Sequence, residues 1–144
     1  MLRNNKRFIK NRFRSPRRAS WQRSSDLISS FRYALQGIIF GFLTQRNFRI
    51  HLFAACIACS LGLWLHLKPI DFAVIVLTVT SVLALELLNT AIEAVVDLSI
   101  GRHFHPLAKT AKDCSAASVL VASISSVLIG SLLLLPPLFS RIGF

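Results

Sequence analysis

Acidic residues are scarce in this chain, and they are confined to a few stretches. Six aspartates and glutamates stand against seventeen lysines and arginines in 144 residues, which gives a net charge of +11. No acid precedes Asp26, whereas nine of the basic residues lie at or before Arg23. Four of the six acids fall between Glu86 and Asp113. We therefore expect the basic end and the acidic stretch to serve different purposes.

Two further absences exclude common kinds of site. The sequence contains neither GxxxxGK[ST] nor GxGxxG, so a nucleotide would have to be held by helices rather than by a glycine-rich loop. Of the three cysteines, Cys56 and Cys59 have the CxxC spacing but stand in an apolar run, without the flanking chemistry of a redox or zinc site. His103, His105 and Cys114 lack a fourth ligand at a usual zinc spacing. We interpret the cysteines as packing residues and the histidines as surface residues.

Apolar residues, by contrast, are abundant. They make up 53% of the chain, which is more than a soluble protein of this size usually carries. We predict an all-α integral membrane protein, with one domain at residues 26–144. Its expected helices are an amphipathic interfacial helix at about 26–45 and three membrane spans at about 50–67, 71–98 and 114–139.

The expected interfacial helix combines an apolar face with a polar one. Leu27 and Phe31 recur at helical spacing, while Arg32 and Gln36 fall on another face. Such a stretch is too polar to cross a membrane but suits the headgroup region. Asp26 is its expected N-cap. The polar residues 45–51 that follow are expected to form a hinge leading into the first span.

The third expected span is rich in small residues that recur every four positions, at Ser118, Ala122, Ser126 and Gly130. Small residues let helix backbones approach closely in a bilayer. We expect this helix to pack against others, in the same chain or in an oligomer.

Residues 1–25 form a basic leader without an acid. We expect a disordered arm held near anionic lipid headgroups, where each Lys or Arg contributes about 1 kcal/mol. A transit peptide or a nucleic-acid tail is the alternative, and nucleic acid is the less favoured partner. More basic residues follow the second span, so the amino terminus is expected in the cytoplasm and the carboxyl terminus outside the plasma (inner) membrane.

Four polar residues interrupt the second expected span, namely Glu86, Asn89, Glu93 and Asp97. On a helix they fall within roughly an 80° arc. The fourteen residues before them, 72–85, supply roughly 21 Å of helix against a hydrocarbon core of about 30 Å. The stripe therefore begins inside the membrane boundary, where carboxylates face a protein interior, a wet cavity or a cation.

This stripe is followed by Lys109, Lys112 and Asp113. Carboxylate oxygens hold Mg²⁺, lysine neutralises phosphate, and a carboxylate can take the proton of an acceptor alcohol. Together these residues supply the groups that phosphoryl transfer needs.

The stretch from Glu86 to Asp97 resembles the signature E-x-x-N-[ST]-[SA]-x-E-x-x-V-D of the small prokaryotic diacylglycerol kinases and undecaprenol kinases. Two flanking blocks are similar to other segments of that family, and the resemblance covers roughly residues 26–130. The blocks are His105-x6-Lys112-Asp113 and, at the amino end, Phe31-Arg-Tyr33-Ala-x-x-Gly37 with Arg46-Asn-Phe48-Arg49.

The resemblance implies a three-span homotrimer that phosphorylates a membrane lipid alcohol with ATP and Mg²⁺ at a composite cytosolic site. By position, Glu86 is expected to be the general base and Asn89 to order the site. The expected ATP-binding residues are Tyr33, Gln45, Glu93, His105, Lys112 and Asp113. The expected metal ligands are Glu93 and Gln45, and the expected lipid-binding residues are Glu86, Asn47, Arg49 and Trp64.

Gln45 departs from the family pattern, because many relatives carry a metal-binding glutamate there. A neutral amide oxygen can still ligate Mg²⁺, directly or through water, but it adds no charge. The resemblance therefore implies weaker metal binding or a different metal position.

Diacylglycerol and undecaprenol remain open as the acceptor, because both present one hydroxyl at the same depth. We favour diacylglycerol and keep undecaprenol as the alternative. A hypothesis of another class is a non-catalytic membrane adaptor, in which the basic arm recruits a partner and the acidic stripe only joins helices.

Overall fold

The computed structural model describes residues 27–101 and 103–143, and the regular structure in these ranges is entirely helical. The basic arm, the expected cap Asp26 and Arg102 lie outside the described residues. The predicted all-α class is therefore confirmed for the described part of the chain. The helices are α2 (Leu27–Thr44), α3 (Arg46–Trp64), α4 (Pro69–Ile100) and α5 (Pro106–Ile142).

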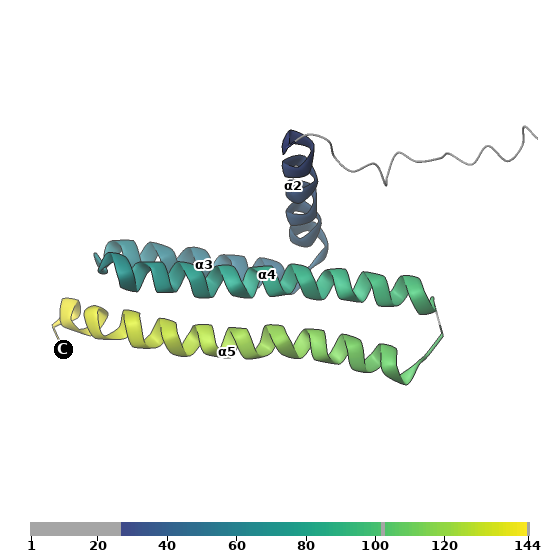
Figure 1. Ribbon diagram of the computed structural model, residues 1–144. Coiled ribbons are helices and arrows are strands. Elements are labelled where there is room, and N and C mark those ends of the chain that lie inside the picture. Colours follow the sequence, from purple (N-terminus) through teal and green to yellow (C-terminus); the bar gives the residue numbers. More distant parts are fainter. Residues whose placement is uncertain (1–26, 102, 144) are drawn as a thin grey trace, which may run out of the picture. The chain divides into compact units, whose positions relative to one another are not determined.

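The chain divides into two compact units, residues 1–35 and residues 36–144. The described part of the first unit is the beginning of α2. In the second unit α3, α4 and α5 lie side by side (Figure 1). The middle helix, α4, packs against both neighbours, whereas α3 and α5 meet at few points.

Prolines and glycines set the helix limits. Pro69 and Pro106 open α4 and α5 at the first helical position, where a missing N–H costs nothing. Gly101 and Gly143 follow the last residues of the same helices with positive φ angles of 59° and 86°, a backbone conformation that glycine adopts without strain. His66 turns the chain between α3 and α4 with a φ of 53°.

The start of α3 differs from the expectation. We expected a polar hinge over residues 45–51, but only Gln45 is extended, with φ −100° and ψ 115°, and the helix begins at Arg46. Polar side chains project from the helix surface, so they do not prevent the backbone from continuing its hydrogen bonds. α4 and α5 likewise run beyond the expected spans, 71–98 and 114–139, because a helix does not have to end at the membrane surface.

All four helices are long and apolar enough to cross a membrane, judged by length and composition. The chain is therefore an integral membrane protein. These two criteria do not distinguish α2 from the other helices, so its place in the interface stays a prediction.

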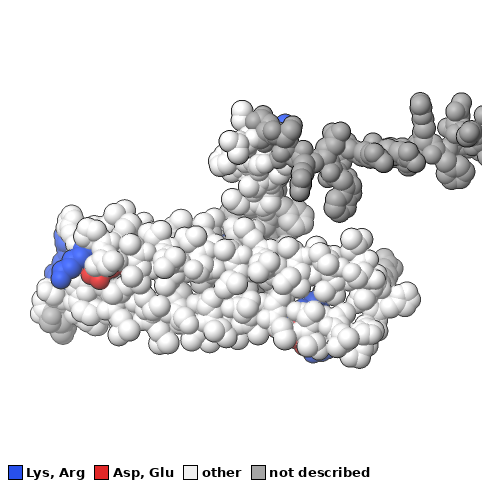
Figure 2. Space-filling model, in the orientation of Figure 1, with Lys and Arg blue, Asp and Glu red and all other residues white. Residues whose placement is uncertain are grey.

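The two longest helices exceed the thickness of a bilayer. α4 has 32 residues and α5 has 37, which corresponds to roughly 48 Å and 56 Å, whereas the hydrocarbon core measures about 30 Å. Figure 2 shows charged side chains gathered at the two ends of the α3–α5 bundle, with an uncharged surface between them. The α4–α5 pair therefore extends out of the hydrocarbon.

The core lies near the turn between α3 and α4. Leu65, Ile75 and Leu134 form a buried cluster that joins the end of α3 to α4 and α5. At the same end, the Arg141 guanidinium lies 4.6 Å from the centre of the Trp64 ring, and its Nη1 donates to the Trp64 carbonyl over 3.0 Å. These contacts hold the carboxyl end of α5 against α3.

Ile75→Ala should lower the stability of the bundle, because Ile75 is 1% exposed and a buried isoleucine truncated to alanine costs about 2 to 5 kcal/mol. The matched control is Ile57→Ala on α3, where the side chain is 52% exposed. Thermal unfolding in one detergent compares the two variants. Equal losses in Tm would contradict the assignment of the core.

Candidate functional site

Glu86 lines a cavity of about 290 Å³ between α3, α4 and α5. The residue is 4% exposed, and its side chain makes no hydrogen bond to another described residue. No buried side-chain oxygen or nitrogen in the described ranges is sealed off without a partner, so the carboxylate reaches the cavity. The lining residues are Asn47, Ile50, His51, Glu86, Asn89, Ala116, Val119, Leu120 and Ser123.

The length of α4 sets the depth of this cavity. A hydrocarbon core of about 30 Å takes about 20 helical residues, and that length counted from Pro69 ends at Leu88. Counted in helix length from Pro69, Glu86 therefore lies in the last turn of such a span, and Glu93, roughly 10 Å further along the axis, lies beyond it. The acidic stripe passes from the apolar zone into water.

Asn89 connects the stripe to α5. Its Nδ2 donates to Glu93 Oε1 over 3.2 Å, and its Oδ1 accepts from the Ser115 hydroxyl over 2.6 Å. Ser115 is 6% exposed, and its hydroxyl also lies 2.9 Å from the Lys112 carbonyl oxygen. The amide therefore fixes one oxygen of Glu93 and leaves the second free to face a cation or a donor.

Two ion pairs lie near the loop between α4 and α5, one of them at the last residue of the stripe. Lys112 Nζ lies 2.6 Å from Asp97 Oδ1, and Lys109 Nζ lies 2.5 Å from Asp113 Oδ2. Both pairs are exposed to solvent, where an ion pair contributes little net stability. Either lysine can therefore exchange its carboxylate for a phosphate at small cost.

Of the other residues predicted for the site, the structure brings Asn47 to the Glu86 cavity. Arg49 instead donates from Nη1 to the carbonyls of Phe42 and Leu43 at the end of α2, over 3.1 Å and 3.2 Å. Trp64 lies roughly 25 Å from Asn47 along α3, at the end of the bundle held by Arg141. The structure thus separates Trp64 from Glu86.

Two predicted nucleotide ligands of the second unit are not among the residues that line the cavity, and a third belongs to the first unit. His105 caps α5, because its Nδ1 accepts from the Leu107 backbone N–H over 3.2 Å, so its Nε2 carries the proton. Gln45 is half-buried at the break between α2 and α3. Tyr33 is 58% exposed on α2, in the unit of residues 1–35.

Sequence reasoning missed two residues of this region, His51 and Ser115. His51 follows Asn47 by four positions, which places both on one face of a helix, but we had expected this segment to be a hinge. Ser115 follows Lys112 by three positions and faces Asn89, but the pattern of small residues began at Ser118. Helical spacing within each segment was the signal available in both cases.

The donors present suit a magnesium ion that is shared with a nucleotide. No group of three or more His, Cys, Asp or Glu side chains in the described ranges could hold a metal by itself. Mg²⁺ is usually held by one or two carboxylates together with waters and substrate phosphates, not by an all-protein cage. The free oxygen of Glu93 fits that requirement.

The helices are long and apolar, and the Glu86 carboxylate opens into a cavity at the membrane boundary. These features define an integral membrane protein with a polar site. The sequence model of the family described as prokaryotic diacylglycerol kinase matches residues 32–134. This chain belongs to that family, as the signature around Glu86 predicted. The match leaves out residues 1–25, the basic leader.

The relatives include enzymes named for two acceptors. A diacylglycerol kinase of Synechocystis sp. is 52% identical over 124 residues, which are 86% of this chain and 71% of the relative. An undecaprenol kinase of Bacillus subtilis is 45% identical over 109 residues, 76% of this chain and 88% of the relative. A diacylglycerol kinase of Escherichia coli is 34% identical over 108 residues, 75% and 88% of the two chains.

Ser115→Ala should slow lipid phosphorylation about fivefold to 150-fold, because removing one partner of a buried hydrogen bond costs about 1 to 3 kcal/mol and frees Asn89 from α5. The matched control is Ser118→Ala, whose exposed hydroxyl donates only to the Ser115 carbonyl. Initial rates in lipid–detergent micelles give the comparison. Equal rates in the two variants would show that Asn89 does not depend on Ser115.

Proposed function

We propose that this lipid kinase transfers the γ-phosphoryl group of MgATP to the hydroxyl of diacylglycerol and forms phosphatidic acid. The observation that carries the proposal is the buried Glu86 carboxylate, which opens into a cavity where α4 leaves the hydrocarbon. A lipid hydroxyl and a water-soluble nucleotide can meet only at such a boundary. Membership of the family supports the kinase reaction.

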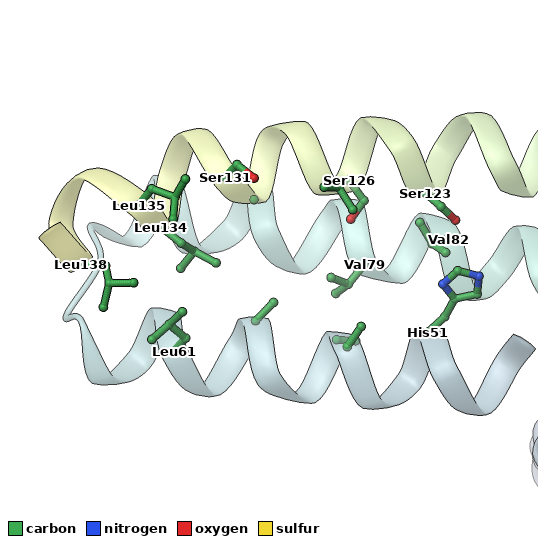
Figure 3. Close-up of a pocket in the computed structure, with 15 residues that line it drawn as sticks. His51, Leu61, Val79, Val82, Ser123, Ser126, Ser131, Leu134, Leu135 and Leu138 are labelled. Atoms are coloured by element: carbon green, nitrogen blue, oxygen red, sulfur yellow. The ribbon is translucent and has the colours of Figure 1, made fainter.

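A second cavity supports a lipid acceptor. It measures about 350 Å³ and is lined by small and apolar residues of α3, α4 and α5, among them Leu61, Val79 and Leu134 (Figure 3). We call this second cavity the apolar groove. It shares His51 and Ser123 with the Glu86 cavity. A hydrocarbon chain in the groove would bring its polar end to Glu86.

Glu86 is suited to accept the proton of the lipid hydroxyl. Its oxygens are not used by another described side chain, so a substrate hydroxyl can donate to them directly. A general base in hydrogen-bond reach of the attacking oxygen typically contributes about 10² to 10⁴-fold to the rate. The alkoxide oxygen that forms then attacks the γ-phosphorus, and the bond to the β-phosphate bridging oxygen breaks.

Glu93 is suited to the nucleotide side of the site. Mg²⁺, when bound there with ATP, would neutralise charge on the phosphates. The free Glu93 oxygen would hold it, with Asn89 keeping the carboxylate in one orientation, and Gln45 is proposed as a further, neutral ligand. The missing charge at Gln45 makes Glu93 the principal protein anion for the metal.

Lys112 is the group best placed to meet phosphate. Its ammonium already reaches back over α4 to Asp97, so it stands on the same side as the acidic stripe. A phosphate offers more oxygens and more charge than one exposed carboxylate. Asp113, His105 and Tyr33 are proposed as further contacts of the nucleotide.

The assembly that we propose is a homotrimer with three spans in each chain and α2 in the interface. The proposed domain is residues 26–144, with 1–25 as a basic arm at anionic headgroups. The amino terminus and the active site face the cytoplasm, because the basic residues gather on that side.

Undecaprenol is the second candidate acceptor, because the Bacillus subtilis relative that bears that name covers most of this chain. Its single hydroxyl and long hydrocarbon chain suit the same two cavities. Purified protein with labelled ATP, Mg²⁺ and each lipid in turn distinguishes the acceptors by the label extracted into the organic phase.

Two substitutions on one helix face test the proposed division of roles. Glu86→Gln should cut turnover about 10² to 10⁴-fold while MgATP affinity stays near wild type, because the base acts on the chemical step. Glu93→Gln should weaken MgATP binding itself, because a metal ligand is lost. Turnover and nucleotide affinity are measured for each folded variant in one lipid mixture, and the opposite pattern would reverse the assigned roles.

A further inference from the structure

His51 and Ser123 stand at the junction of the two cavities. Both line the Glu86 cavity and both line the apolar groove. Figure 3 shows His51 projecting from α3 toward Ser123 of α5 at one end of the groove. Further along the apolar groove, α3 contributes Ala54 and Ala58, so the cavity wall changes from polar to apolar at His51.

The His51 ring has hydrogen-bonding groups that the described part of the protein does not use. The side chain is half-buried, and it makes no hydrogen bond to another described residue. It lies close enough to Glu86 for the two side chains to interact electrostatically. A neutral imidazole offers one N–H donor and one acceptor nitrogen.

The neighbouring polar groups offer mainly acceptors. Ser123 donates its hydroxyl hydrogen to the Val119 carbonyl over 2.8 Å, so its oxygen can only accept a further hydrogen bond at the junction of the cavities. Glu86 as a carboxylate accepts only, and the Asn89 amide donates to Glu93. The Asn47 amide also offers donors in the Glu86 cavity, but it does not line the apolar groove. His51 therefore supplies the uncommitted N–H donor at the level where the apolar groove begins.

We propose that His51 binds an ester carbonyl of the acceptor lipid and so selects glycerides among lipid alcohols. This inference rests on the proposed function. In a 1,2-diacylglycerol the free hydroxyl and the nearer ester oxygen lie on adjacent carbon atoms. The hydroxyl can therefore donate to Glu86 while the neighbouring ester carbonyl accepts from the His51 N–H. A polyprenol carries no carbonyl and leaves His51 unpaired.

The test compares dioleoylglycerol with its diether analogue, in which both ester carbonyls are absent and the hydroxyl and chains are kept. Wild-type protein should prefer the ester by about tenfold in kcat/KM, the value of one hydrogen bond to a neutral acceptor. His51→Phe should reduce that ratio to about one, chiefly by slowing the ester. His51→Gln, which keeps an N–H donor, should restore part of the preference.

The MgATP KM should stay unchanged in each variant, which separates a lipid contact from general damage to the site. The control is His66→Asn, which removes a distant histidine and places at the positive φ a residue that tolerates it. An equal loss for ester and ether in His51→Phe would overturn the proposal. So would a wild-type protein without an ester preference, a result that needs no variant to fold.

The outcomes also separate this inference from the proposed function. A wild-type protein that phosphorylates ester and ether equally keeps the kinase and loses the role of His51. A wild-type protein that phosphorylates undecaprenol but neither glyceride contradicts the diacylglycerol acceptor and the ester contact together.

Discussion

An ionised carboxylate among apolar helices is costly unless it reaches water, a cation or a hydrogen-bond donor. Glu86 is in this position, because it is almost fully buried and no described side chain donates to it. The cavity against α3 and α5 relieves the cost by keeping its oxygens accessible. A group that the fold leaves without a partner is thereby available to a substrate hydroxyl.

The mismatch between helix length and bilayer thickness divides the molecule into two zones. Within the hydrocarbon, α3, α4 and α5 pack through apolar residues and leave a groove where α3 and α5 meet at few points. Beyond it, α4 and α5 continue together and carry Asn89, Glu93 and the Lys112–Asp97 ion pair. Glu86 lies where the zones join, on one continuous surface of α4 with Asn89 and Glu93, and there we propose that lipid and nucleotide meet.

Much of this arrangement could be predicted from the sequence. The spacing of Glu86, Asn89 and Glu93 predicted one helix face, and the hydrogen bond between Asn89 and Glu93 is consistent with it. Local spacing could not reveal contacts between helices, such as Ser115 with Asn89, because these depend on how α4 and α5 pack.

The expected hinge at 45–51 was wrong because polar residues were taken as a break, and this error hid His51. Trp64 stays a predicted lipid-binding residue, and α3 places it near the other end of the bundle from Glu86.

The central claim is that the acceptor lipid occupies the Glu86 cavity and the adjoining groove. Photocrosslinking with a diacylglycerol that carries a diazirine on the first carbons of one acyl chain tests it directly. We expect labelled residues on α3 and α5 around His51 and Ser123, with labelling reduced by excess unmodified diacylglycerol. Labelling concentrated around Trp64 and Arg141, or labelling that excess lipid does not reduce, would contradict it.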